Sequence, residues 1–208
     1  HMRDFHAVEH HSMLEREPPT HTRLRGLVLR AFTSARVRAL GPEIERVAED
    51  LAHALPAEAP FDLIPAYCTQ IPVRIIARLL GVPEAMWPDL LRWSNAMVAV
   101  YQAGCDHAGQ VAANAAAADF SAFLRGYVDK RRRDPRDDLI TQLIAAEAEG
   151  SKLSTDALIG TCILLLNAGH EATVHALGNG VACLLGHALH QGGGPASLLG
   201  ADDCAATV

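Results

Sequence analysis

The sequence has little of what marks a nucleic-acid-binding, disulfide-rich or membrane protein. Lys and Arg number 18 against 24 Asp and Glu, a net charge of −6, whereas nucleic-acid binding calls for a basic surface. The five cysteines are odd in number and not closely paired, which indicates a reducing compartment rather than a disulfide framework. No uncharged apolar run reaches the roughly 20 residues of a bilayer-spanning helix, and no signal peptide is evident. We therefore expect a soluble cytoplasmic protein without nucleic-acid or membrane partners.

Aromatic residues make up only 5% of the chain, while half of its 208 residues are apolar and alanine is abundant. This composition is typical of an all-α protein with a substantial core. His1 and Met2 look like the remnant of a cloning tag, and residues 1–19 read as a polar N-terminal segment. We expect residues 20–208 to form a single helical domain.

The apolar spacing predicts several helices after this segment. Thr20 is the expected cap of the first helix, and Pro72 is expected to kink a later one. The longest helix is predicted over residues 153–189, with Ser154 and Thr155 as caps. It is apolar on nearly all sides, which is typical of a helix buried in the middle of a larger structure.

The stretch LLLNAGHEATVHALGNG (residues 164–180) places polar side chains within this apolar run. HEATVH is close to the zinc-protease signature, but two zinc-binding histidines on one helix stand four residues apart. His170 and His175 are five apart, roughly 140° around a helix, so we expect no metal site from them. A buried Glu171 either pairs with a neighbouring helix or belongs to a proton path, and this stretch alone leaves both possibilities open.

LLLNAGHEAT (residues 164–173) resembles the central helix of the cytochrome P450 haem-thiolate monooxygenases, which carries Ala/Gly-Gly-x-Asp/Glu-Thr over the haem. Five further stretches are similar to this family in order and spacing: EREPPTHTRLRGLVLRAFT, FDLIPAYCTQIPVRIIARLLGVP, DDLITQLIAAEAEGSKLSTDAL, ALGNGVACLLGH and LLGADDCAATV. On these motifs the chain is identified as a member of the family. The resemblance implies a partial cytochrome P450 fold, in which other helices surround a long central one.

The resemblance also assigns residues to the haem. His21 and Arg25 lie four apart on one helical face and are assigned to the haem propionates, because paired donors suit a carboxylate. A solvated basic face is the alternative for these two residues. Ala168 and Gly169 are small enough to let the helix lie against the cofactor and dioxygen.

The proton-delivery residues depart from the family pattern. Glu171 matches the family's acid, which passes protons toward the reduced oxygen. The family usually has Thr next, but here that position is Ala172, and the hydroxyl follows at Thr173, turned by about 100° on the helix. Our hypothesis is that an ordered water or a substrate hydroxyl completes the proton route.

Three apolar residues are candidates for a substrate pocket by the same resemblance: Trp93, Met97 and Leu165. The spacing of Trp93 and Met97 is equally consistent with ordinary packing. The N-terminal histidines (residues 6–11) have chelating spacing, but we expect them to belong to a mobile polar segment.

In this family a cysteine thiolate in a glycine-containing loop binds the haem iron. None of the cysteines lies in such a loop: Cys68, Cys105, Cys162, Cys183 and Cys204. We therefore expect haem as cofactor with its axial ligand absent from this chain, which would be the middle part of the fold.

The function that the resemblance implies is hydroxylation or epoxidation of a lipophilic small molecule, with dioxygen and two electrons from a ferredoxin-type partner. The alternative is a haem-free relative that acts as an auxiliary, for example to a glycosyltransferase. We also expect an exposed apolar face on the central helix, which favours oligomers.

Overall fold

The structure is a computed structural model and describes residues 1–148 and 153–190. Within these residues the chain is helical and forms no strand, which confirms the all-α prediction. The helices are α1 (Arg3–His11), α2 (Thr20–Ala31), α3 (Ser34–Ala39), α4 (Gly41–His53), α5 (Gln70–Leu80), α6 (Trp87–Val98), α7 (His107–Arg133), α8 (Leu139–Ala148) and α9 (Thr155–His190). Four short helical turns join them: η1 (Met13–Glu15), η2 (Ile64–Cys68), η3 (Glu84–Met86) and η4 (Ala99–Tyr101).

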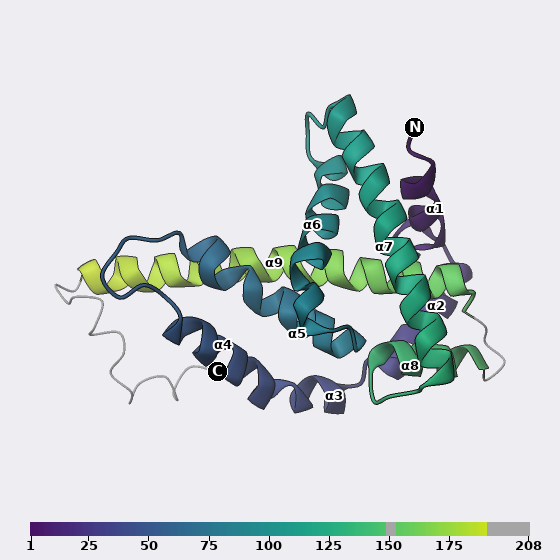
Figure 1. Cartoon of the computed structure of the whole chain (residues 1–208), viewed down its shortest axis with the longest axis horizontal. Helices are drawn as coiled ribbons and strands as arrows, with labels where there is room; N and C mark the ends of the chain where they lie inside the picture. The colour runs from purple at the N-terminus through teal and green to yellow at the C-terminus, as the bar shows by residue number, and fades with distance from the viewer. Residues whose placement is uncertain (149–152, 191–208) are drawn as a thin grey trace.

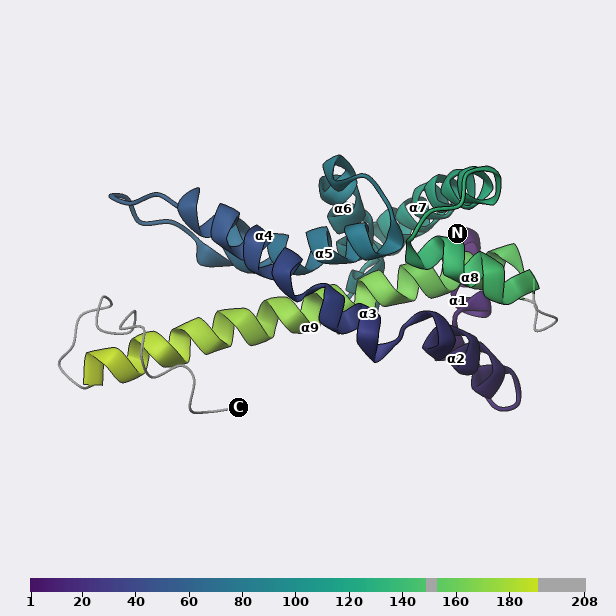
Figure 2. The same cartoon turned by 90° about the horizontal axis from the view of Figure 1, so that it is seen from below.

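Helix α9 runs the length of the molecule, with α5 lying along it and α6 and α7 rising from it (Figure 1). The predicted central helix is thereby confirmed, and Ser154 caps it by accepting a hydrogen bond from the backbone N–H of Ala157 at 3.1 Å. The first half of α9 is buried, as at Leu158 and Leu166. The second half is largely exposed and projects beyond the other helices (Figure 2).

The segment Thr155–His187 of α9 is long and apolar enough to cross a membrane by length and composition. It is not an uncharged run, because Asp156 and Glu171 lie within it, so the expectation of no uncharged apolar run of about 20 residues is not contradicted. However, 56% of its most apolar window is buried inside the protein, as in the core helix of a soluble protein.

The main core lies where α6, α7 and α9 meet. Trp93 of α6 stacks on Phe120 of α7, with 5.3 Å between ring centroids. Met97 of α6 and Leu124 of α7 are fully buried in the same cluster. The core is thus built from long helices that cross, and it holds the first half of α9 in place.

Residues 3–11 form helix α1, so the prediction of a mobile polar segment was wrong there. Phe5 and Val8 are buried, and Met2, which was set aside as a tag remnant, is also part of the core. The side-chain oxygen of Asn114 on α7 accepts hydrogen bonds from the backbone N–H of Asp4 (2.7 Å) and of Phe5 (3.2 Å). These contacts are distant in sequence, and the local polarity of the segment gives no sign of them.

Helix α1 also packs closely on α9. A Cβ added at Gly160 would lie 3.2–3.3 Å from three α1-side backbone atoms, including the Val8 carbonyl oxygen. The glycine therefore lets the two helix backbones approach one another.

Two predicted details of helix ends differ from the structure. Thr20 is the first residue of α2 and makes no capping hydrogen bond, because the chain enters the helix from Pro19. Pro72 is the third residue of α5, directly after the turn η2. Its missing N–H is not needed in a first helical turn, so it lies at the start of α5 rather than inside the helix as predicted.

The end of α5 is locked to α7 and α8 by a buried ion pair. Arg131 of α7 pairs with Asp138, and both side chains are 5% exposed. Arg131 also donates to the Gly81 carbonyl at 2.7 Å. Gly81 ends α5 with a φ of 80°, and a Cβ there would overlap the Asp138 carboxyl group. This joint fixes α5 against its neighbours.

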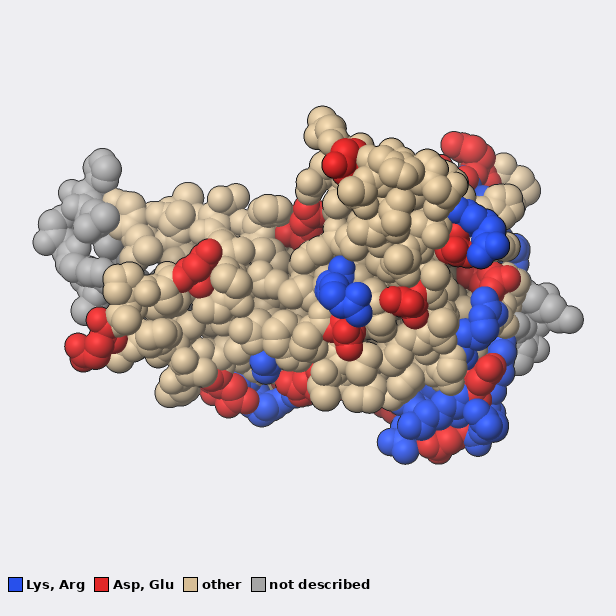
Figure 3. Space-filling model, turned by 45° about the horizontal axis from the view of Figure 1, so that its top comes forward, with Lys and Arg blue, Asp and Glu red and all other residues tan. Residues whose placement is uncertain are grey.

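Charged side chains are unevenly spread over the surface. Lys and Arg gather at the end of the molecule away from the second half of α9, whereas the opposite part of this face carries few charges (Figure 3). Leu184 and Leu185 of α9 are 57% and 40% exposed. The predicted exposed apolar face on the central helix is present.

Candidate functional site

An apolar cleft with a volume of about 430 Å³ lies between α9 and α5. Three of the sequence-predicted site residues line it together, namely Leu165, Ala168 and Gly169. The other lining residues come from α9, α5, the turn η1 and the residue after α2: Leu164, Ile76, Leu79, Leu80, Met13 and Phe32. Carbon and sulfur dominate this lining, as a flat lipophilic cofactor requires.

Gly169 also brings the walls of the cleft together. A Cβ at this position would lie 3.0 Å from Cδ1 of Ile76 on α5, closer than side chains normally pack. Ala168 beside it is exposed at the cleft. The two small residues therefore have separate consequences: one allows α5 and α9 to approach, and the other leaves the cleft open.

The predicted propionate ligands lie on α2, whose last residue precedes Phe32 in the cleft wall. Arg25 is exposed and His21 is half-buried. Neither side chain forms a hydrogen bond or ion pair within residues 1–148 and 153–190. Arg25 and Phe32 are seven residues apart, so they lie within about 20° of one another around a helix axis and roughly 10 Å apart along it. The face of α2 that bears Arg25 thus continues toward the cleft.

The acid and hydroxyl predicted for proton delivery lie at the edge of the buried half of α9. Glu171 has a side chain 43% exposed, and one carboxylate oxygen is 3.9 Å from Nε2 of His175. Ala172 and Thr173 are both exposed. The Thr173 hydroxyl donates to the Gly169 carbonyl at 2.8 Å, so it is bound to the helix backbone.

Two polar residues of α9 that have a buried side-chain atom were missed as site candidates. His170 is 5% exposed and its Nδ1 has no hydrogen-bond partner in the described structure, while burial lowers the pKa of its imidazole. Oδ1 of Asn167 is likewise buried without a partner. Both lie within the quoted motif, and the signal that could have identified them is a polar side chain in an otherwise apolar run.

Trp93 and Met97 do not line the cleft. Trp93 packs between Phe120 and Phe123 of α7, and Met97 is fully buried. The sequence left two roles open for these residues, lining a substrate pocket or packing in the core. In the structure both pack in the core.

None of the described cysteines lines the cleft either. Burial, followed by the charge of Asp138, raises the pKa of Cys162 to about 12, so this thiol stays protonated. Cys68 is also buried, and Cys183 is exposed on α9 away from the cleft. Cys204 lies outside the described residues.

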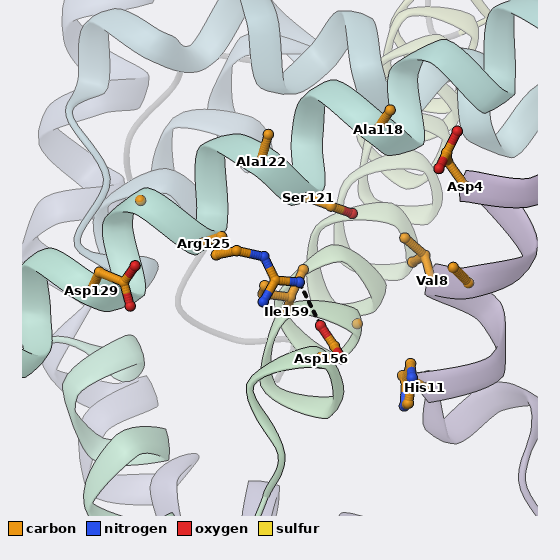
Figure 4. Close-up of a pocket in the computed structure, with 13 residues that line it drawn as sticks. Asp4, Val8, His11, Ala118, Ser121, Ala122, Arg125, Asp129, Asp156 and Ile159 are labelled. Atoms are coloured by element: carbon orange, nitrogen blue, oxygen red, sulfur yellow. Dashed lines mark hydrogen bonds and ion pairs between the residues drawn. The ribbon is translucent and has the colours of Figure 1, made fainter.

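A larger groove of about 620 Å³ lies between α1, α7 and α9 (Figure 4). The ion pair between Arg125 and Asp156 crosses it. None of the residues predicted from sequence for catalysis, haem or substrate lines this groove. The predicted site residues that line one of these two cavities, Leu165, Ala168 and Gly169, all lie at the smaller apolar cleft.

Comparison with known proteins places the chain in a family. No family model matches it. It is 39% identical over 185 residues to vitamin D(3) 25-hydroxylase of Pseudonocardia autotrophica, which covers 88% of this chain and 44% of that protein. It is also 39% identical over 175 residues to cytochrome P450 107B1 of Saccharopolyspora erythraea, covering 84% of this chain and 42% of that one.

Solved structures that are similar to this chain are also cytochromes P450. The crystal structure of P450BioI with an acyl carrier protein ligated to hexadec-9Z-enoic acid has a TM-score of 0.84 and 29% identity, covering 91% of this chain and 49% of that chain. Myxobacterial CYP267B1 in complex with myristic acid has a TM-score of 0.77 and 36% identity, covering 86% and 44%. The chain, which spans about half the length of the relatives it matches, therefore belongs to the cytochrome P450 family.

Proposed function

We propose that this chain forms the oxygen-activating side of a haem-dependent monooxygenase, which hydroxylates or epoxidises a lipophilic small molecule with dioxygen and two electrons. The observation that carries this proposal is the apolar cleft where Leu165, Ala168 and Gly169 meet. Relatives named as a hydroxylase or a hydroxylase/epoxidase support it.

The residues present fit one face of a haem. The cleft is apolar, and Ala168 presents only a methyl group to it, while Ile76 lies beside Gly169. His21 and Arg25 are donors without a partner in the described structure, and they suit a pair of carboxylates. When bound, haem supplies the iron chemistry that activates dioxygen. In our proposal His21 and Arg25 hold its carboxylates, and Ala168 and Gly169 lie against the ring.

The chain's own contribution to chemistry is to hold and move protons beside the cleft. We assign this role to the Glu171 carboxylate, which is half-exposed and so can exchange protons with solvent. Thr173 does not supply the neighbouring hydroxyl, because its proton is donated to the Gly169 carbonyl. Ala172 has no hydroxyl group. A water molecule or a hydroxyl of the substrate then has to take the place of the hydroxyl that the family usually has next to the acid.

The substitution Ala172→Thr tests this proton route. We expect wild-type enzyme to couple reductant consumption to product formation efficiently with its own substrate, and the threonine to bring no gain. The measurement is the ratio of product to reductant consumed in both forms. Poor coupling in the wild type together with good coupling in Ala172→Thr would show that the substrate-assisted route is wrong.

The electron donor that we propose is an acidic, ferredoxin-type protein. Arg30 and Arg38 are exposed on α2 and α3, and neither is in an ion pair within the described part of the chain. A surface of this kind steers an acidic partner toward it. We propose a cytoplasmic location, since such donors are soluble.

No observation favours the haem-free auxiliary. The relatives compared above are named vitamin D(3) 25-hydroxylase and cytochrome P450 107B1, and the donors and cleft that would serve a haem are present.

The proposed function is tested with the longest polypeptide in which this chain occurs, reconstituted with haem, a ferredoxin and its reductase. With isotopically labelled dioxygen, we expect one labelled oxygen atom in the product of a lipophilic substrate, such as a macrolactone or a fatty acid. Haem incorporation without label in any product would contradict the proposal.

A further inference from the structure

Helix α1 carries two histidines that the proposed function does not use. His6 and His10 are four residues apart, so they lie about 40° apart around the helix and about 6 Å apart along it. This is the spacing at which two imidazoles on one helix bind the same metal ion. The sequence favours a mobile segment over a metal site here, whereas in the structure residues 3–11 form a helix.

Long-range contacts hold this helix in place. Phe5 and Val8 are buried in the main core, and Oδ1 of Asn114 on α7 accepts hydrogen bonds from two backbone N–H groups of α1. The Val8 carbonyl oxygen belongs to the close contact with Gly160 of α9. The backbone that carries the two histidines is therefore ordered before any metal ion binds, which lowers the entropy cost of binding.

Both histidines face away from the core. Their mean direction lies roughly 150° around the helix from that of the buried residues Phe5, Val8 and Ser12. His6 and His10 are exposed, and neither forms a hydrogen bond or ion pair within residues 1–148 and 153–190. Their ring nitrogens are therefore available as metal ligands.

The two rings contact their neighbours in sequence. The His10 ring meets the His11 ring edge-on with 5.2 Å between centroids, and the His6 ring meets the Phe5 ring edge-on at 5.9 Å. Because these contacts are local and lie at the surface, the two rings can turn about their side-chain bonds to face one another. His11 is five residues from His6, roughly 140° around the helix, and it lines the groove of Figure 4 instead.

The charges around the pair favour a cation. Glu9 lies about 60° from His6 around the helix. Burial raises the pKa of the Glu9 carboxyl group, and the charge of His6 acts in the opposite direction, so the two side chains lie near one another. Arg3, which is on the same side of α1 as the pair, has its own partner in Asp4 at 3.2 Å.

We propose that His6 and His10 together bind a divalent transition-metal ion such as Zn²⁺, with water in the remaining coordination positions. Among residues 1–148 and 153–190, no group of three or more His, Cys, Asp or Glu side chains could hold a metal ion, so the site has two protein ligands. Imidazole is a ligand that suits Zn, Cu and Ni. By joining two successive turns, the ion stabilises the part of α1 that bears Glu9, whose carboxylate accepts a hydrogen bond from Tyr101 at 2.7 Å.

Zn²⁺ titration of the full chain by calorimetry tests the proposal. Cys183 and His187 of α9 are also four residues apart and exposed, so every protein, including the parent, carries Cys183→Ser to remove this competing thiolate. His6→Gln and His10→Gln should each weaken binding by at least about tenfold, since losing even a group that supports a ligand costs about 10- to 100-fold. His10→Gln leaves His6 and His11 five residues apart, so it also tests the spacing.

His11→Gln and His53→Gln are the matched controls. His11 is next to the pair but on another side of α1, and His53 is exposed on α4. Both variants should bind Zn²⁺ as the parent protein does. Because the substituted residues of the pair are exposed, circular dichroism and melting curves recorded without metal should agree for all variants.

Hydrogen exchange gives a second readout at α1 itself. At a Zn²⁺ concentration about 100 times the Kd, an ion that binds only the closed helix slows exchange through local opening by up to about 100-fold. We expect this slowing at residues 7–11 of the parent protein and not in His6→Gln. The proposal would be overturned by absence of Zn²⁺ binding in the parent protein, by equal affinity in the parent and both pair variants, by an equal loss in His11→Gln, or by unchanged exchange at α1. The test uses neither haem nor dioxygen, so its outcome is independent of the proposed function.

Discussion

The hydroxyl of Thr173 is 2.8 Å from the carbonyl oxygen of Gly169, one turn earlier on α9. This bond joins the hydroxyl that follows the family's acid to the backbone of the glycine in the cleft. While this bond is made, the hydroxyl has no hydrogen to donate to a ligand, although its oxygen can still accept one. The relationship supports our proposal that the displaced threonine does not replace the one that the family usually has at position 172.

The substitution Thr173→Val tests that explanation. We expect unfolding free energy to change by less than about 1 kcal/mol, because the side chain is exposed and its bond is local. The coupling of reductant to product should also be unchanged. Chemical denaturation and the product-to-reductant ratio check the two parts, and a large loss of coupling would show that the hydroxyl acts in proton delivery.

The buried ion pair between Arg131 and Asp138 should dominate the stability of the joint between α5, α7 and α8. Arg131→Met leaves the Asp138 charge buried and unpaired, which is expected to cost about 3 to 5 kcal/mol. Arg125→Met is the matched control on the same helix. Its ion pair with Asp156 has both side chains about half exposed, so the expected loss is below about 1 kcal/mol. Equal losses in urea denaturation would contradict this assignment.

The burial of His170 predicts a dependence of stability on pH. Burial, outweighing the charge of Glu171, lowers the pKa of this imidazole in the folded state below its ordinary value of 6.5. Below pH 6.5 the unfolded chain therefore binds more protons than the folded one, and stability falls as the pH falls.

The substitution His170→Leu should remove this part of the pH dependence, whereas the exposed His175→Gln should leave it in place. The measurement is the unfolding free energy between about pH 7 and pH 5. A wild-type slope that persists in His170→Leu would show that other groups cause it.

The exposed apolar face of α9 predicts self-association of the chain. Leu184→Lys combined with Leu185→Glu should lower the apparent mass in light scattering, because it places charges on that face without changing net charge. Val111→Lys, which alters an exposed apolar residue on α7, is the control and should not. A wild-type protein that stays monomeric and melts cooperatively at all concentrations would refute the prediction.

Sequence alone predicted the elements that depend on local pattern. The bounds of α9 follow from its apolar run and the cap at Ser154. The small residues Ala168 and Gly169 were placed beside a cleft because a motif of known geometry contains them.

Contacts between distant segments were not predictable in the same way. Helical spacing shows which face is apolar but not which partner covers it, so α1 was missed although Phe5 and Val8 are buried on α7 and α9. The same ambiguity left Trp93 and Met97 open between pocket and core. Phe32 and Ile76 line the cleft only because three helices converge there.

The most direct test of the central claim is a haemin titration of the chain and of two phenylalanine variants. Ala168→Phe fills the cleft, whereas Ala176→Phe adds the same side chain at an exposed position two turns further along α9. If the cleft beside Gly169 receives the flat face of a haem, Ala168→Phe should weaken binding by at least about tenfold, since a filled pocket excludes the ring. Ala176→Phe should bind as the wild type does. Equal haemin affinity in all three proteins would contradict the account.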